Sequence, residues 1–218
     1  MQKYSQNEAQ DSFGNADVTE VQRLESLWNG EFGDQYTQRN QNAGVGRTQF
    51  WQIIVQKCAP ERVLEVGCNV GANLRPLSEQ VPQHSLYGID INETALSHLR
   101  RGELSGVNSL WASARDLPFK DEYFDLVFTM GVLIHQPEAS LPFVMSEIVR
   151  CSKRYVLCGE YADENTVEVP YRGETGALFR RPYGAIYQLQ FPHLKLIESG
   201  FLGRESGWDD VTFWLFEK

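Results

Sequence analysis

The sequence predicts an α/β fold, in which a mostly parallel sheet of seven strands carries helices on both faces. Three observations lead to this prediction. From Arg62 onward, apolar runs of strand length alternate with amphipathic segments, which is typical of parallel strands joined by crossover helices. A glycine-containing turn follows the first of these strands. The link LGRESGWD between the last two strands is short, and this favours an antiparallel last strand because a parallel return needs about a dozen residues or more.

The N-terminal part of the chain predicts a helical cap in front of the sheet. Residues 1 to about 17 are polar, and we expect them to be frayed or mobile. The segment VTEVQRLESLWNG (18–30) then places Val21, Leu24 and Trp28 on one helical face.

A second helix is expected in GRTQFWQIIVQKCA (46–59), where Pro60 ends it. The chain is therefore expected to divide into a mobile N-terminus with a helical cap or lid, residues 1–45, and one α/β domain, residues 46–218.

The elements of the α/β domain follow in order from its apolar runs. Helices are expected from about residue 72, at 92–102, at 141–151 and near 184–191, with a loop over 162–182. Strands are expected at 62–67, 85–90, 108–112, 124–130, 154–161, 194–201 and 210–217.

Composition narrows the range of functions. The formal charge of −9 argues against a basic face that follows a nucleic-acid backbone. Neither a signal peptide nor a membrane span is visible, so a cytoplasmic protein is expected. No metal site is expected either, because the cysteines lack CxxC pairs and zinc-ligand spacing; we expect them to be reduced and mostly buried: Cys58, Cys68, Cys151 and Cys158.

The turn after the first strand, VLEVGCNVGANL (63–74), predicts a nucleotide-type cofactor site. Gly67 and Gly71 allow the backbone to approach a ligand closely, and Asp90 ends the second strand where a carboxylate can accept hydrogen bonds from ribose hydroxyls. Asn69 occupies the place of a middle glycine, and asparagine tolerates the positive φ that such a turn requires. A tight turn without a ligand is the less favoured alternative, given the spacing of Asp90.

The residues around the turn favour S-adenosylmethionine over a dinucleotide. Glu65 lies inside the strand, and the third glycine of G-x-G-x-x-G is absent, so the backbone N–H groups that would meet a pyrophosphate are not indicated. A cofactor with ribose and adenine but no phosphate fits better, and the amino group of S-adenosylmethionine suits an acidic pocket.

The loop after the third strand agrees with this cofactor. Its segment SAR supplies a polar side chain and backbone N–H groups that can read the adenine edge, although an ordinary loop is the alternative. The predicted cofactor site comprises Glu65, Gly67, Cys68, Asn69, Gly71, Asp90, Ile91, Ser113, Ala114, Arg115, Met130 and Arg39.

In these motifs, VLEVGCNVG, YGID, SARDLPF and FDLVFTMGVLIH, the chain resembles class I S-adenosylmethionine-dependent methyltransferases over residues 60–160. The resemblance implies a Rossmann-like sheet, S-adenosylmethionine as cofactor and a methyltransferase domain over residues 46–218. The family commonly has glycine at the position of Asn69, so the chain departs from the pattern there.

A narrower resemblance involves both ends of the chain. The segments LWNGEFGDQYTQRN, GVLIHQP, VPYRGETGALFRRPYG and FPHLKLIESGF look like methyltransferases associated with pseudaminic acid biosynthesis in bacteria. This implies a bacterial enzyme of sugar biosynthesis whose acceptor is a sugar, a sugar nucleotide or a nonulosonic acid, methylated at O or N.

His135 and Tyr36 are the candidate catalytic residues. His135 lies just beyond the fourth strand, where a group that titrates near neutrality can act as a base, although a structural histidine is the alternative. Tyr36 and Arg39 belong to a polar segment that can fold over the cofactor as a lid or can simply connect two helices.

The long loop 162–182 is the candidate acceptor site. Tyr171, Arg172 and Arg180 lie in it, and arginine can bind a carboxylate or phosphate through two hydrogen bonds. A solvated cluster is the alternative.

Two other function classes remain open at this point: an NAD-dependent oxidoreductase on a similar fold, and a non-catalytic protein that binds S-adenosylmethionine as a scaffold. A nucleic-acid methyltransferase is less favoured, because TMGVLIHQP stands where its Asn/Asp/Ser-Pro-Pro-aromatic motif is expected. The expected partner is a small-molecule acceptor, without nucleic acid or membrane. The sequence does not indicate an oligomeric state.

Overall fold

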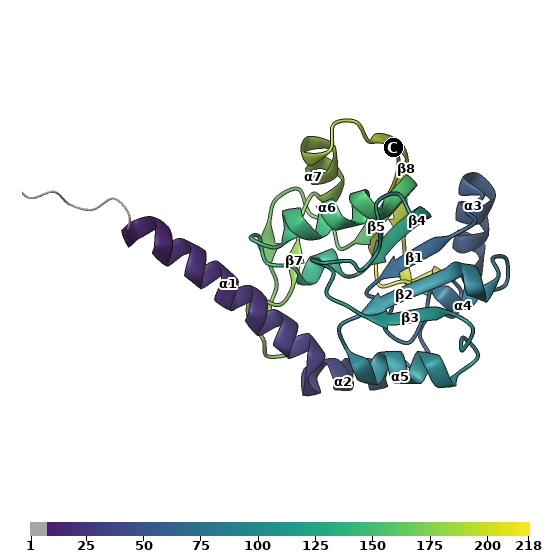
Figure 1. The fold of residues 1–218 in the computed structure, drawn as a ribbon, viewed down its shortest axis with the longest axis horizontal. Coiled ribbons are helices and arrows are strands. Elements are labelled where there is room, and N and C mark those ends of the chain that lie inside the picture. The colour runs from purple at the N-terminus through teal and green to yellow at the C-terminus, as the bar shows by residue number, and fades with distance from the viewer. Residues whose placement is uncertain (1–7) are drawn as a thin grey trace, which may run out of the picture.

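The chain folds around one seven-stranded sheet, with a long N-terminal helix lying beside it (Figure 1). The computed structural model describes residues 8–218, and within the first helix it describes side chains from residue 18 onward. The strand order is β3-β2-β1-β4-β5-β9-β8. These strands span Asn108–Trp111, Leu86–Asp90, Val63–Val66, Phe124–Met130, Ser152–Glu160, Val211–Glu217 and Lys195–Leu202.

Strand direction follows the prediction. Strands β3, β2, β1, β4 and β5 pair in parallel, whereas β9 pairs antiparallel with both β5 and β8. The predicted seven-stranded, mostly parallel, Rossmann-like sheet with an antiparallel last strand is therefore confirmed. The order changes direction between β1 and β4, and ligands bind at the carboxyl ends of strands at such a switch point.

Helices cover both faces of the sheet because its central strands are apolar on both sides. On one face, α6 and α7 pack over Leu64, Val127 and Val156. On the other, α3, α4 and α5 pack over Val63 and Phe128. The helices span Leu141–Cys151 (α6), Tyr183–Gln190 (α7), Thr48–Cys58 (α3), Leu74–Leu77 (α4) and Glu93–Arg101 (α5).

The N-terminal cap consists of two helices, of which one was not predicted. Helix α1 runs over Glu8–Asn29, so it begins well before residue 18; of the expected frayed segment, residues 1–7 lie outside the described residues. Helix α2, Glu31–Arg39, has only Phe32 and Tyr36 as large apolar side chains. Its sequence therefore left two interpretations open, a lid over the cofactor or a connector between two helices. It turns sharply away from α1, and a side chain at Gly33 would lie 1.8 Å from the Trp28 carbonyl oxygen.

The expected loop 162–182 contains a small sheet of its own. Strands β6, Val167–Glu168, and β7, Phe179–Arg180, pair antiparallel. Two-residue strands are too short to show an alternating pattern, so the sequence did not reveal them. The remaining described elements are three short 3₁₀ turns, η1 (Gln83–Ser85), η2 (Leu133–His135) and η3 (Arg204–Ser206).

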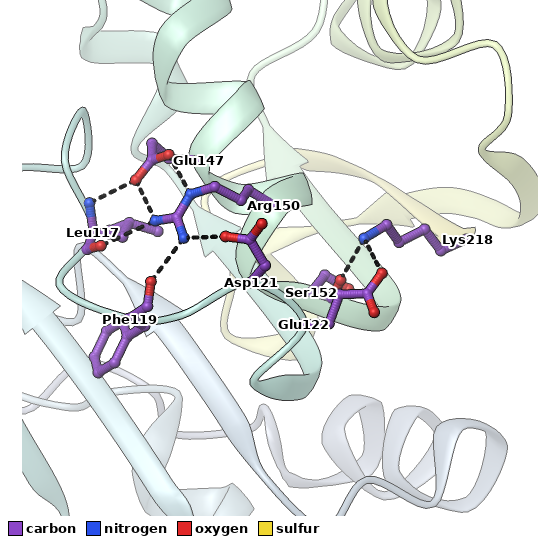
Figure 2. A network of polar contacts seen from close by, with 8 residues as sticks. All are labelled: Leu117, Phe119, Asp121, Glu122, Glu147, Arg150, Ser152 and Lys218. Atoms are coloured by element: carbon purple, nitrogen blue, oxygen red, sulfur yellow. Dashed lines mark hydrogen bonds and ion pairs between the residues drawn. The ribbon is translucent and has the colours of Figure 1, made fainter.

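A polar network fastens the loop after β3 to α6 (Figure 2). The Arg150 guanidinium donates to both carboxylate oxygens of Glu147 and to the carbonyl oxygens of Leu117 and Phe119. The Glu147 carboxylate also accepts the Leu117 N–H at 2.8 Å. The loop that precedes β4 is therefore held by one arginine and one glutamate.

All four cysteines are buried and unpaired, in agreement with the prediction. Within the part of the chain that the structure describes, no helix has both the length and the apolar character needed to cross a bilayer.

Replacing Arg150 with alanine should lower the free energy of unfolding by about 2 kcal/mol, because it leaves buried carbonyl groups without donors. The matched control is Arg154→Ala, whose ion pair with Glu217 is exposed and screened by solvent, so its loss should change the free energy of unfolding much less. Urea denaturation measures both, and equal losses would contradict the bracing role of Arg150.

Candidate functional site

A cavity of about 530 Å³ opens at the carboxyl ends of the parallel strands. Its walls come from the ends of β1, β2, β4 and β5, from α1 and α2, and from the segment before β9. This volume lies within the range of about 300–1,000 Å³ that is usual for small-molecule sites. The N-terminal helices therefore close a site that the sheet alone would leave open.

The turn after β1 has the left-handed backbone that its sequence predicted. Gly67, Asn69 and Gly71 have φ values of 76°, 45° and 79°. The Asn69 side chain accepts the Val70 N–H at 2.7 Å, which stabilises the turn locally. At Gly67 a Cβ atom would lie 2.4 Å from Val132, so glycine is required there.

Asp90 holds this turn in place. Its Oδ2 accepts the Asn69 N–H and its Oδ1 accepts the Asn92 N–H, each at 2.8 Å. Burial raises the pKa of Asp90, while these two hydrogen bonds oppose that rise. Each carboxylate oxygen has capacity for a further hydrogen bond, so Asp90 can still accept from a ligand.

Glu65 is a buried carboxyl group with one unsatisfied oxygen. Its Oε1 accepts from Asn73 Nδ2 at 2.7 Å, while Oε2 is buried and has no partner among the described residues. Burial raises the pKa of Glu65 to about 8. A buried polar atom without a partner costs free energy, so this oxygen is suited to accept a hydrogen bond from a ligand in the cavity.

Arg47 braces the same corner of the cavity. It donates to Asn73 Oδ1 and to the Gly207 carbonyl oxygen, both at 2.9 Å, and its guanidinium lies 4.2 Å from the Trp208 ring centre. The start of α3 is thereby tied to the turn after β1 and to the segment before β9.

An aromatic group forms the opposite wall. The Trp28 ring centroid lies 4.3 Å from His135, 5.4 Å from Tyr36 and 6.5 Å from Tyr171. These four side chains come from α1, α2, η2 and the loop 162–182. Residues far apart in sequence thus meet around Trp28.

His135 is held in one tautomer. Its Nδ1 lies 2.6 Å from the Ala177 carbonyl oxygen, which can only accept, so Nδ1 carries the proton and Nε2 carries the lone pair. Burial lowers the pKa of His135 to about 4, so the ring is neutral near pH 7.

The turn that carries His135 is anchored by Glu160 at the end of β5. The buried carboxyl accepts the N–H groups of Val132 and Ile134 at 3.3 and 3.2 Å. Burial raises the pKa of Glu160 to about 7.

Two arginines lie at the ends of the aromatic wall. The Arg39 guanidinium is 5.9 Å from the Tyr36 ring centre, and that of Arg172 is 5.9 Å from the Tyr171 ring centre. Neither makes an ion pair with any described residue. Arg172 also has a φ of 50°, and the N–H and C=O groups of Tyr171 and Glu174 bond to each other around it.

Most predicted site residues line the cavity, but three do not. Gly71 lies against Leu104 outside the cavity walls. Arg115 and Arg180 are exposed, and neither lines the cavity. Predicted residues in the walls are Tyr36, Arg39, Glu65, Gly67, Cys68, Asn69, Asp90, Ile91, Ser113, Ala114, Met130, His135, Tyr171 and Arg172.

The prediction missed wall residues supplied by tertiary contacts. Trp28 was assigned to the apolar face of a helix, and Arg47 and Asn73 were not singled out. Glu25 had a usable signal, because it stands four residues after Val21 and three before Trp28, on the side of α1 that packs inward.

Comparison with known families identifies the core of this architecture. Residues 63–154 match the family described as a methyltransferase domain. The matched residues run from the start of β1 into β5, and they include the turn, Asp90, the loop after β3 and His135.

Proteins similar to this chain include methyltransferases. The malonyl-[acyl-carrier protein] O-methyltransferase of Legionella pneumophila is 31% identical over 110 residues, 49% of this chain and 37% of that protein. A phthiotriol/phenolphthiotriol dimycocerosates methyltransferase of Mycobacterium ulcerans is 33% identical over 91 residues, 41% of this chain and 33% of that protein. The chain thus covers little more than a third of the length of these relatives.

Solved structures share the fold over nearly the whole chain. Magnesium protoporphyrin IX methyltransferase from Synechocystis, with bound S-adenosylmethionine, has a TM-score of 0.67 and 16% identity, covering 91% of this chain and 97% of that one. The 1,6-didemethyltoxoflavin-N1-methyltransferase of Burkholderia thailandensis has a TM-score of 0.63 and 14% identity, covering 100% and 92%. The predicted class I methyltransferase fold is confirmed.

The raised pKa values of Glu65 and Glu160 predict that the free energy of unfolding falls as the pH rises. Their ordinary pKa is 4.5, but in the folded protein the values are about 8 and about 7. Stability from the protonated carboxyls is therefore present below pH 4.5 and is lost as the pH rises through the folded pKa values. Above pH 6.5 His135 opposes this fall only slightly, because it is neutral in the folded protein and less than half charged in the unfolded chain.

The free energy of unfolding should consequently fall between about pH 6.5 and pH 9, by on the order of 2 kcal/mol. Urea denaturation at constant ionic strength measures it. The double variant Glu65→Gln, Glu160→Gln should show a flatter profile, and an equally steep one would show that other groups are responsible.

Proposed function

We propose that this protein transfers a methyl group from S-adenosylmethionine to a small-molecule acceptor. The observation that carries the proposal is the acidic cofactor side of the cavity, where the partnerless Oε2 of Glu65 and the turn-holding carboxylate of Asp90 lie together within the residues that match a methyltransferase domain. Both groups suit a cofactor that has hydroxyl and ammonium donors, because Asp90 accepts hydrogen bonds and an ammonium group beside Glu65 would favour the charged form of its carboxyl.

The residues present fit this cofactor. Glu65 would receive its ammonium group, Asp90 its ribose hydroxyls, and the glycine turn would let the backbone approach. When bound, the cofactor supplies an electrophilic methyl group on a sulfonium.

Acceptor chemistry is assigned to the aromatic wall. Neutral His135, with its lone pair on Nε2, is suited to receive a proton from an acceptor hydroxyl or amine. Tyr36 is suited to donate a hydrogen bond instead, because burial raises the pKa of its phenol and keeps it protonated. The remaining cap residues exclude water and align the acceptor.

For the acceptor we propose a sugar, a sugar nucleotide or a nonulosonic acid, methylated at O or N. Aromatic faces suit sugar rings, and the arginines without ion pairs, Arg39 and Arg172, suit a carboxylate or phosphate. The resemblance to methyltransferases of pseudaminic acid biosynthesis supports the same class. The named relatives act on acyl carriers, phthiotriols and porphyrins, so their names do not select the acceptor.

The proposal places the protein in the bacterial cytoplasm, without a nucleic-acid or membrane partner; the charge of −9 supports only the absence of a nucleic-acid partner. One similar structure gives a reason to test a second candidate, a non-catalytic protein that binds the cofactor. One structure of this fold, with a TM-score of 0.56, is a [4+2]-cyclase, so the fold does not by itself imply methyl transfer. A non-catalytic scaffold would bind the cofactor and methylate no acceptor.

Calorimetry should detect S-adenosylmethionine binding, and Asp90→Ala should weaken it at least about tenfold because a charged hydrogen-bond acceptor contributes about 1.5–3 kcal/mol. Glu122→Ala, at an exposed position that pairs with Lys218, is the control. Binding of NADH in place of S-adenosylmethionine would instead support an oxidoreductase.

Incubation with labelled S-adenosylmethionine and a panel of nucleotide sugars, nonulosonic acids and amines tests the acceptor. For an anionic acceptor, Arg172→Gln should raise KM about tenfold or more, because a charge-assisted contact is lost. Arg180→Gln, at an exposed position of β7 outside the cavity walls, should leave KM unchanged. Equal effects of the two substitutions would contradict the role of Arg172.

A further inference from the structure

The N-terminal helix α1 brings a carboxylate to the loop after β3. The Ser113 hydroxyl donates to Glu25 Oε1 at 2.6 Å, and the two residues are 88 positions apart in the chain. Both side chains line the cavity, next to Ala114. Glu25 makes no ion pair with any described residue, so its charge is not neutralised there.

The hydrogen bonds of this corner leave one free acceptor and one free donor. Ser113 uses its hydrogen toward Glu25, and its oxygen accepts the Arg115 N–H at 3.2 Å. Oε2 of Glu25 remains as an anionic acceptor. Among the described residues, the Ala114 N–H makes no backbone hydrogen bond outside the regular elements, which leaves a donor beside it.

A donor next to an acceptor is complementary to the edge of adenine, which has a ring nitrogen that accepts and an exocyclic amino group that donates. We propose that Glu25 accepts the exocyclic amino group of the cofactor's adenine, so that α1 provides a residue of the cofactor site. This inference rests on the proposed function, because it assumes an adenine-containing cofactor. It goes further by assigning base selectivity to a residue outside the matched methyltransferase domain.

The contact also links the two halves of the cavity. Glu25 and Trp28 are three residues apart on α1 and therefore share a face. Trp28 contacts His135 and Tyr171, while its carbonyl oxygen accepts from Asn92, which follows Asp90 and Ile91. Asn92 also donates to Asp34 of α2 at 2.9 Å. A cofactor held by Glu25 consequently fixes the helix that forms the acceptor wall.

Glu25→Gln tests the assignment, because it replaces one accepting carboxylate oxygen with a donating amide NH₂ group and keeps the shape of the side chain. The amide oxygen can still accept from Ser113, which directs the amide NH₂ toward the base. That NH₂ opposes the amino group of adenine but can donate to the O6 of hypoxanthine. The probes are S-adenosylhomocysteine and S-inosylhomocysteine, measured by calorimetry without any acceptor.

The wild-type protein should prefer S-adenosylhomocysteine, and Glu25→Gln should weaken its binding about tenfold and reduce the preference. Glu31→Gln on α2, where Glu31 pairs only with Gln35 at an exposed position, should behave as wild type. Unchanged affinity and preference in Glu25→Gln would overturn the inference while leaving the cofactor proposal intact. A wild-type protein that binds neither probe would refute the cofactor proposal, and this inference with it.

Discussion

Asp90 accepts the N–H groups of Asn69 and Asn92, and this pair of hydrogen bonds joins the end of β2 to the turn after β1. Strands β1 and β2 pair along the sheet, but their pairing ends before Asn69. Without the hydrogen bonds to Asp90, Asn69 with its left-handed backbone would lose its link to the end of β2. The cavity opens at this turn, at the switch point of the strand order. One carboxylate thus shapes the backbone, and in the proposed function it also binds the ribose, so a substitution of Asp90 affects both roles.

The site is completed by segments that do not belong to the sheet. Helices α1 and α2 supply Trp28, Tyr36 and Arg39, and the loop 162–182 supplies Tyr171 and Arg172. Figure 1 shows the arrangement of these helices: α1 projects from the domain, and its C-terminal end turns into α2, which lies beside α5. A sheet shared by many methyltransferases can therefore serve different acceptors by changing only the terminal segments.

Buried carboxyls distinguish this cavity from an apolar pocket. Glu65 and Glu160 are nearly inaccessible, and burial raises both pKa values toward neutrality. Glu160 recovers part of the cost through the N–H groups of the His135 turn, whereas Glu65 keeps an unsatisfied oxygen. Glu160 therefore supports the turn that carries His135, whereas in the proposed function the unsatisfied oxygen of Glu65 meets a donor group of the cofactor.

The sheet, the antiparallel last strand, the turn and most of the cavity residues around that turn were predictable from the sequence. These features depend on short-range patterns: apolar strands, a Gly67–Gly71 turn and an acid at the end of β2. The sequence did not reveal α2, the β6–β7 pair or the absence of Gly71, Arg115 and Arg180 from the cavity walls. Those features follow from the folded chain, which also brings Glu25 to Ser113 and Trp28 to His135. The sequence could not predict them, because contacts between distant segments leave no period or spacing in the chain.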